Sequence, residues 1–137
     1  MEPALNSLLA GFPIFIAHFA LTVLLLFVGV VVYHWITPHH EMKLIRAGNT
    51  AAAVSLGGMI VGLGLPLAVS LANSITLFDI LIWGVVALAI QLATYFAIDI
   101  LLRGLSKRIE EGQISSAILL AAAKISVAAI NAAALSS

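Results

Sequence analysis

The amino-acid sequence predicts an all-α membrane protein with four transmembrane helices, built as a parallel tandem repeat of two-helix units. Hydrophobic residues make up 63% of the chain and charged residues 9%, whereas soluble domains are about half apolar and a quarter charged. Four apolar runs are each long enough to cross a bilayer core, which takes roughly 20 residues. A segment at residues 45–53 also returns in altered form at residues 109–117. Lipid must therefore cover most of this chain.

The four runs cover residues 11–36, 49–72, 77–102 and 113–135. Backbone groups in lipid must form hydrogen bonds within their own segment, so each run predicts a helix rather than a strand. The first helix follows a short head, residues 1–10, and carries Pro13 near its start, where proline is tolerated. Tyr33 and Trp35 at its end are typical of an interfacial aromatic belt. We expect one transmembrane domain over residues 1–137.

The repeat pairs the two helices of about residues 11–72 with those of about 77–135. In each copy a charged turn is followed by Gly48-Asn49 or Gly112-Gln113 and then by a helix of small residues. Asn49 and Gln113 are expected to cap these helices, because a side-chain oxygen at the N-cap accepts a bond from an otherwise unpaired backbone N–H. Two helices per copy give both copies the same orientation, which makes the repeat parallel.

Positive charge is concentrated in two short turns. Five of the six Lys and Arg residues lie there, namely Lys43, Arg46, Arg103, Lys107 and Arg108. Because positive charge in short loops marks the cytoplasmic side, we expect both charged turns in the cytoplasm and both termini outside.

Small residues line one face of the second helix, and Gly58-x-x-x-Gly62 has the spacing of a close helix contact. Ser55 shares this face, and Ala121 and Ala128 form a similar stripe on the fourth helix. The sequence therefore predicts helix packing through these residues and a homo-oligomer.

Lys124 is the clearest candidate for function. It lies about eleven residues from each end of its predicted helix, or roughly 16 Å at 1.5 Å per residue, where a charge costs about 2.5–3.5 kcal/mol on insertion scales. Asn131 shares its face, Gln91 is a candidate partner from the third helix, and His18 is expected at a similar depth. Two interpretations remain open: the group fixes helix register, or it forms an intramembrane polar site.

Two carboxylates have structural explanations from the sequence. Asp99 continues a partly polar stripe that Gln91, Thr94 and Tyr95 form on the third helix. It also lies four residues before Arg103, the spacing of a helix ion pair, and this pair is the preferred interpretation. Asp79 lies at a helix start, where the helix dipole favours negative charge.

Several function classes are not indicated. The chain has no cysteine, and it shows no nucleophile–base set, phosphate loop or paired catalytic carboxylates, so no enzyme and no cofactor is predicted. His34, His39 and His40 with Glu41 match no standard metal-site spacing, and no metal is expected. No basic face points to nucleic acid.

The chain resembles the YjfL-like family of bacterial inner-membrane proteins, known as domain of unknown function 350. The residues that carry the resemblance are Thr37-Pro38-His39, Leu44-Ile45, Asn49-Thr50-Ala51-Ala52, Trp83-Gly84, Ala89-Ile90-Gln91-Leu92 and Ile130-Asn131-Ala132-Ala133. It covers nearly the whole chain and implies a multi-pass protein of the inner (plasma) membrane with a link to envelope stress. The second copy departs from the family pattern at Gln113-Ile114-Ser115-Ser116 and at Lys124.

Two functions are consistent with these features. The preferred one is a self-associating membrane scaffold or anchor in envelope-stress or membrane-remodelling processes, with a cytoplasmic or membrane protein partner. The alternative is an oligomeric ion or proton channel or transporter that uses His18, Gln91, Lys124 and Asn131. In the alternative, Lys124 lining a pore would favour anions, whereas Lys124 paired with a carboxylate would point to proton coupling.

Overall fold

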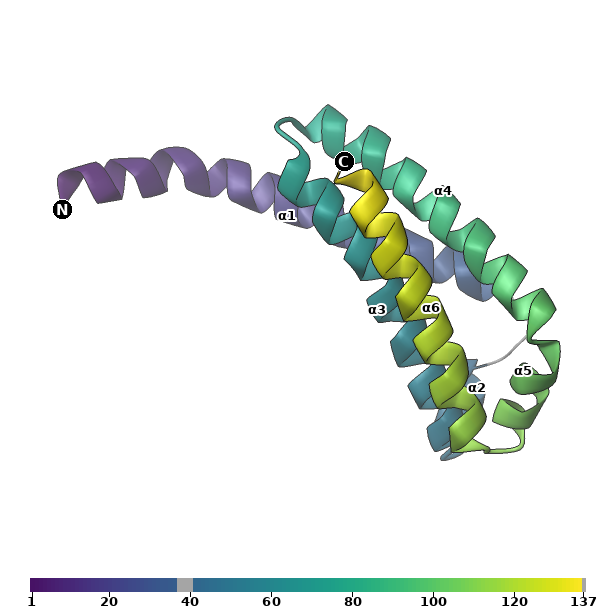
Figure 1. The fold of residues 1–137 in the computed structure, drawn as a ribbon. Coiled ribbons are helices and arrows are strands. Elements are labelled where there is room, and N and C mark those ends of the chain that lie inside the picture. The colour runs from purple at the N-terminus through teal and green to yellow at the C-terminus, as the bar shows by residue number, and fades with distance from the viewer. Residues whose placement is uncertain (37–40, 137) are drawn as a thin grey trace.

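The computed structural model describes residues 1–36 and 41–136. The described residues form the helices α1 (Glu2–Ile36), α2 (Glu41–Arg46), α3 (Thr50–Asn73), α4 (Leu77–Leu101), α5 (Arg103–Glu110) and α6 (Ile114–Leu135). Among them, α1, α3, α4 and α6 are long and apolar enough to cross a membrane. The last three agree with the predicted runs to within one residue. In Figure 1, α3 and α6 lie side by side and run in the same direction, and α2 and α5 lie at one end of the bundle.

The first helix is longer than predicted. It begins at Glu2, so residues 2–10 are helical and not a separate head, and Pro13 lies inside the helix rather than near its start. Its N-terminal half extends away from the other helices in Figure 1. The C-terminal half packs through Leu25, Gly29 and Tyr33, which recur every four residues on one face. Apolar composition alone did not show where this face begins.

The two charged segments fold as the short helices α2 and α5 rather than as turns. Both end in a glycine with a positive φ, +91° at Gly48 and +90° at Gly112. The hydrogen bonds also match: the N–H groups of Gly48 and Asn49 donate to the carbonyls of Ile45 and Leu44, at 2.9 Å each. Those of Gly112 and Gln113 donate to Ile109 and Arg108 at 2.9 and 3.0 Å. Each helix thus closes with a Schellman motif, which needs a left-handed residue that glycine adopts without strain.

Asn49 and Gln113 follow these motifs but behave differently. The Oδ1 atom of Asn49 accepts a bond from the backbone N–H of Ala52 at 3.0 Å and so caps α3. Its Nδ2 atom donates to the carbonyls of Ile109 and Glu110 at 3.0 and 3.2 Å, which ties the start of α3 to the end of α5. Gln113 occupies the N-cap position of α6, but its side chain caps no backbone N–H. Its Oε1 atom accepts a bond from the Ser116 hydroxyl instead, because the longer side chain of glutamine reaches past the first free N–H groups.

Replacing Asn49 by alanine is expected to lower the free energy of unfolding by about 3 kcal/mol, from a lost helix cap of about 1 kcal/mol and two lost hydrogen bonds of about 1 kcal/mol each. Gln113→Ala, at the matching position, should lose well under half as much, because it removes only the bond to Ser116. Equilibrium unfolding in mixed micelles, followed by helical circular dichroism, measures both. Equal losses would contradict the difference between the two caps.

Close packing of small residues joins α3 to α6, the most extensive helix contact in the described structure. A Cβ atom added at Gly58 would overlap the Cβ of Ala121 and lie 2.9 Å from its Cα, and one at Gly62 would overlap the Tyr95 hydroxyl. The predicted small-residue faces therefore meet within one chain. In lipid this matters, because apolar tails offer no hydrophobic driving force and helices associate through packing.

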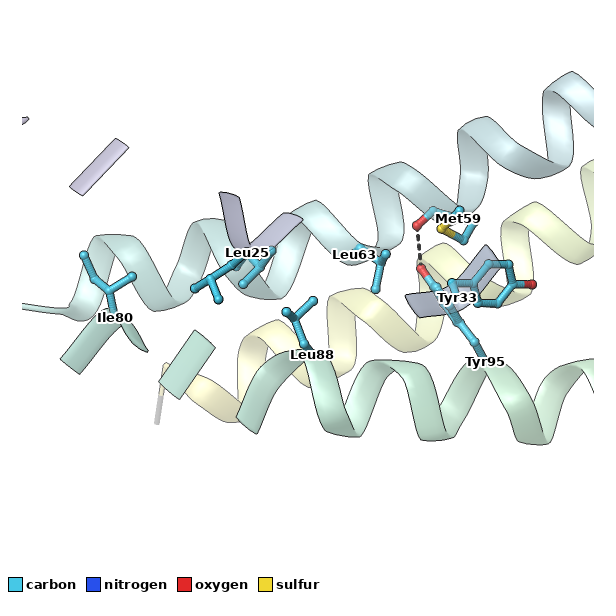
Figure 2. Close-up of a cluster of buried hydrophobic side chains, with 8 residues drawn as sticks. Leu25, Tyr33, Met59, Leu63, Ile80, Leu88 and Tyr95 are labelled. Carbon is cyan, nitrogen blue, oxygen red and sulfur yellow. Dashed lines mark hydrogen bonds between the residues drawn. The ribbon is translucent and has the colours of Figure 1, made fainter. Parts of the chain in front are cut away.

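A cluster of larger side chains fills the space between α1, α3 and α4. Figure 2 shows Leu25, Leu63 and Leu88 together, with Ile80 further along and Tyr33 and Tyr95 at the other end. Leu25 and Leu88 pack into gaps left by glycines: a Cβ atom at Gly84 would lie 2.6 Å from Leu25, and one at Gly29 would lie 2.7 Å from Leu88. This cluster separates the polar residues near α5 from the opposite end of the bundle.

Candidate functional site

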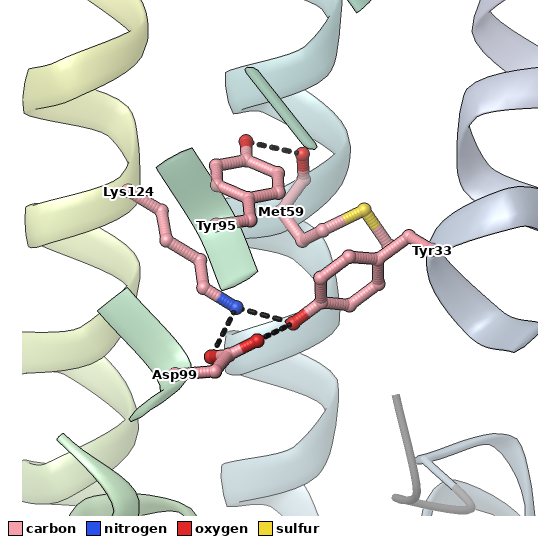
Figure 3. Close-up of polar contacts among 5 residues, drawn as sticks. All are labelled: Tyr33, Met59, Tyr95, Asp99 and Lys124. Carbon is pink, nitrogen blue, oxygen red and sulfur yellow. Dashed lines mark hydrogen bonds and ion pairs between the residues drawn. The ribbon is translucent and has the colours of Figure 1, made fainter. Parts of the chain in front are cut away.

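An ion pair lies inside the bundle at the end of the cluster that faces α5. The Nζ atom of Lys124 is 3.0 Å from Oδ1 of Asp99, and the two side chains are 1% and 18% exposed. The Tyr33 hydroxyl donates to Oδ2 of Asp99 at 2.8 Å and accepts a bond from Lys124. Figure 3 shows the three side chains converging from α6, α4 and α1. Three largely apolar helices thus contribute one polar group each to a single point.

The direction of the Lys124 side chain follows from helix geometry. Side chains in an α-helix lean toward the N-terminus of their own helix, and α6 begins at the α5 end of the bundle. The lysine stem therefore carries the ammonium from mid-helix toward that end. Asp99 lies two residues before the end of α4, and Tyr33 lies three residues before the end of α1. Both side chains therefore lie at the depth that the Lys124 ammonium reaches.

Two aromatic rings enclose the ammonium. The Nζ atom lies 4.7 Å from the ring centroid of Tyr33 and 5.1 Å from that of Tyr95, both within cation–π range. The rings meet edge to face, 80° apart with centroids 5.6 Å apart. The Tyr95 hydroxyl donates to the Met59 carbonyl at 2.9 Å and closes the side of the site away from α5.

Gln91 and Asn131 form a second polar contact, further from α5. The Nδ2 atom of Asn131 donates to Oε1 of Gln91 at 3.1 Å and to the Ala87 carbonyl at 3.5 Å. Gln91 is fully buried, and its Nε2 donor has no hydrogen-bond partner among the described residues. An unsatisfied buried donor costs about 1–3 kcal/mol. The Gln91 amide thus contacts Asn131 and not Lys124, and it leaves one costly polar group in the core.

Several expected contacts are wrong. Gln91 is not the partner of Lys124. The described residues show no ion pair between Asp99 and Arg103, because Asp99 turns inward to Lys124. His18 does not approach the site: it lies 15 residues before Tyr33 in α1, or about 22 Å along the helix. Tyr33 is 5% exposed and belongs to the site rather than to an interfacial belt, whereas Trp35 is 78% exposed.

The other predicted roles fall as follows. Asp79 completes a capping box with Thr76 at the start of α4. Lys43, Arg46, Arg103, Lys107 and Arg108 are all exposed on or beside α2 and α5. Ala128 is fully buried on α6. Among the described residues, no three His, Asp or Glu side chains gather as metal ligands, and His39 and His40 lie outside those residues.

A small pocket connects the ion pair with the α5 end. Its lining includes Tyr33, Asp99, Lys124, Ser55, Ser106 and the exposed Glu110. The space that the centre of a water molecule can occupy in this pocket is about 10 Å³. This is close to the smallest volume that holds one ordered water molecule. Sequence reasoning assigned Ser55 to packing and did not consider Ser106, since neither serine has a motif around it.

Asp99 and Tyr33 had one usable sequence signal each. The spacing of Leu25, Gly29 and Tyr33 places the tyrosine on a face that carries a glycine, a mark of a close helix contact. Asp99 lies eight residues after Gln91 and four after Tyr95, so all three share one face of α4. Acids within transmembrane segments usually face the bundle interior, which favours an inward partner for Asp99 over the local spacing to Arg103.

Comparison with known proteins gives consistent matches. The model of the family described as Domain of Unknown Function (DUF350) matches residues 7–135. The UPF0719 inner membrane protein YjfL of Escherichia coli (strain K12) is 32% identical over 129 residues, which covers 94% of this chain and 95% of the relative. The UPF0719 transmembrane protein YshE of Bacillus subtilis (strain 168) is 28% identical over 85 residues, 62% of this chain and 63% of the relative. No solved structure matches the chain.

Proposed function

This chain is an integral membrane protein of the DUF350 family, and from that premise we propose that it transfers protons across the bilayer through the Lys124–Asp99 pair. The observation that carries the proposal is this ion pair, enclosed by membrane-spanning helices and reached by a pocket. Ionisable groups inside a bilayer are costly, and proton relays are one of their recurrent uses. The proposal goes beyond the family match, which assigns no activity.

The chemistry of the pair suits proton exchange. At 3.0 Å, one proton can pass from the Lys124 ammonium to the Asp99 carboxylate, which turns a charged pair into a neutral amine and a carboxylic acid. Burial disfavours isolated charges, so the ammonium and the carboxylate each need the other as a counter-charge. The Tyr33 hydroxyl bonds both partners and holds them in place while the proton moves.

Proton flux into liposomes that carry the purified protein tests the proposal. A potassium gradient with valinomycin sets the membrane potential, and an internal pH dye reports flux. We expect flux above that of empty liposomes, and a fall to the empty-liposome level in Lys124→Arg, because arginine keeps the charge but does not deprotonate in proteins. Lys107→Arg, an exposed lysine on α5, should conduct like the native protein. Unchanged flux in Lys124→Arg would overturn the proposal.

We further propose that the four membrane-spanning helices form a parallel repeat of two-helix units, and that the end of the bundle with α2 and α5 lies in the cytoplasm. The matching Schellman motifs after α2 and α5 support the repeat. The concentration of Lys and Arg at this end supports the orientation. A cysteine replacing Lys107 should react with a membrane-impermeant thiol reagent in inside-out vesicles and not in intact spheroplasts. The reverse pattern would contradict the orientation.

A self-associating anchor is a second candidate function, supported by the N-terminal half of α1. Phe12, Phe15 and Phe19 stack along this half, with centroids 6.4 and 5.9 Å apart, and each is more than half exposed. We propose a second copy of this chain as the group that covers it. A photo-crosslinking residue at Phe15 should yield a dimer, and one at the equally exposed Phe96 on α4 should not. Adducts to lipid alone at Phe15 would exclude this contact.

A further inference from the structure

We infer that the pocket beside the Lys124–Asp99 pair binds one water molecule that brings protons to the pair, and that it opens only toward the α5 end. This inference rests on the proposed function and names the entry side and the residues of the entry site. Ser55 and Ser106, which are 3% and 6% exposed, would hold the water.

Two serine hydroxyls, those of Ser55 and Ser106, line this pocket. Neither Ser55 nor Ser106 has a side-chain hydrogen bond to any described residue. Buried hydroxyls without a protein partner are normally satisfied by ordered water, and the volume of about 10 Å³ is about what one such molecule needs. A hydroxyl both donates and accepts, so a water between the serines and the ion pair can accept a proton on one side and donate one on the other.

The pocket is asymmetric along the bundle. On the α5 side its lining ends at Glu110, an exposed carboxylate at the end of α5. On the other side Tyr95, Met59 and Leu63 are at most 1% exposed, and the Tyr95–Met59 hydrogen bond closes the gap between α3 and α4. These three residues belong to the apolar cluster shown in Figure 2, which continues toward the opposite end of the bundle. The pocket therefore gives water access to Lys124 from α5, past polar and apolar side chains alike. An apolar barrier lies on the opposite side, and proton transfer across the bilayer requires this barrier to open.

The natural absence of cysteine allows a direct test. Ser55→Cys and Ser106→Cys place single thiols in the pocket, and Ag⁺ is small enough to follow water into it. The ion displaces the thiol proton and forms an S–Ag bond, and the thiols left free are then counted with a fluorescent maleimide after denaturation. Ala87→Cys is the matched control, because Ala87 is fully buried on α4 and lies 12 residues before Asp99, about 18 Å away along the helix.

We expect both pocket thiols to react when Ag⁺ is added on the side where Lys107→Cys reacts, and not when it is added on the other side. They should react at least about tenfold faster than Ala87→Cys, since a thiol in a closed core must wait for local opening. No reaction at either pocket thiol in folded protein, or equal reaction from both sides, would overturn the inference. The assay needs no proton flux, so the inference can fail while the proposed function stands. Equally, the pocket can admit Ag⁺ from the α5 side although the protein transfers no protons.

Discussion

Replacing Lys124 by methionine is expected to lower the free energy of unfolding by about 3 kcal/mol or more, the typical loss when one partner of a buried ion pair is removed. Methionine fills much of the lysine stem but leaves the Asp99 carboxylate without its counter-charge. The Tyr33 hydroxyl also loses the ammonium that donates to it. Equilibrium unfolding in mixed micelles measures the loss, and Lys107→Met on the exposed face of α5 should change stability by less than about 0.5 kcal/mol.

A second substitution separates the charge effect from lost packing. In Lys124→Met with Asp99→Asn, no charge remains unpaired, and the asparagine oxygen can still accept the Tyr33 hydrogen bond. We expect the double variant to recover most of the stability, because neutral replacements of a buried pair are often close to neutral overall. The resulting double-mutant cycle should give a coupling energy of about 1–3 kcal/mol. Additive losses would mean that Lys124 and Asp99 do not interact in the membrane.

The double variant also decides between the two interpretations of Lys124. If the lysine only fixes helix register, a variant that folds to native stability should keep whatever activity the protein has. If Lys124 and Asp99 carry protons, the same stable variant should show no proton flux above empty liposomes. Stability and flux therefore separate in one variant, which the single substitutions do not allow, since each of them disturbs both.

Hydropathy was enough to predict the membrane-spanning helices, because lipid selects for length and apolar composition. It could not predict where α1 begins, since residues 1–10 and 11–36 are both rich in apolar residues and no charge interrupts them after Glu2. The charged segments were expected as turns, yet they form α2 and α5. Gly48-Asn49 and Gly112-Gln113 were predicted only as helix starts, but their glycines also end α2 and α5.

The candidate site was half predicted for a related reason. Lys124 is conspicuous because charge is rare in lipid, so its depth alone marked it. Its partner depends on how α1, α4 and α6 rotate about their axes, and local spacing carries no such information. The i to i+4 rule therefore assigned Asp99 to Arg103, although Asp99 pairs with Lys124, 25 residues away in sequence. The difference follows from burial. An exposed ion pair with Arg103 would add little stability, whereas the buried Lys124 ammonium is shielded from solvent and needs a counter-charge inside the bundle.

Gly58→Ala is expected to lower the free energy of unfolding by about 1–3 kcal/mol, the usual penalty for overpacking. The added methyl group would overlap Ala121 and approach its backbone, so α3 and α6 must move apart along their main contact. A flexible side chain could turn aside, but a backbone atom and a Cβ cannot. The movement should also loosen the site, because Lys124 lies three residues after Ala121 on the same helix.

Gly57→Ala is the matched control, since it is the neighbouring residue of the same helix and an added Cβ there meets nothing within 4 Å. Alanine is the better helix former, by up to about 1 kcal/mol, so Gly57→Ala should be neutral or stabilising. Adding Ala121→Gly to Gly58→Ala removes the opposing methyl group and should restore part of the stability. A loss at Gly57 as large as that at Gly58 would show that glycine serves α3 through backbone flexibility. Opposite signs at adjacent residues would instead identify the approach of α3 to α6 as the reason for glycine at Gly58.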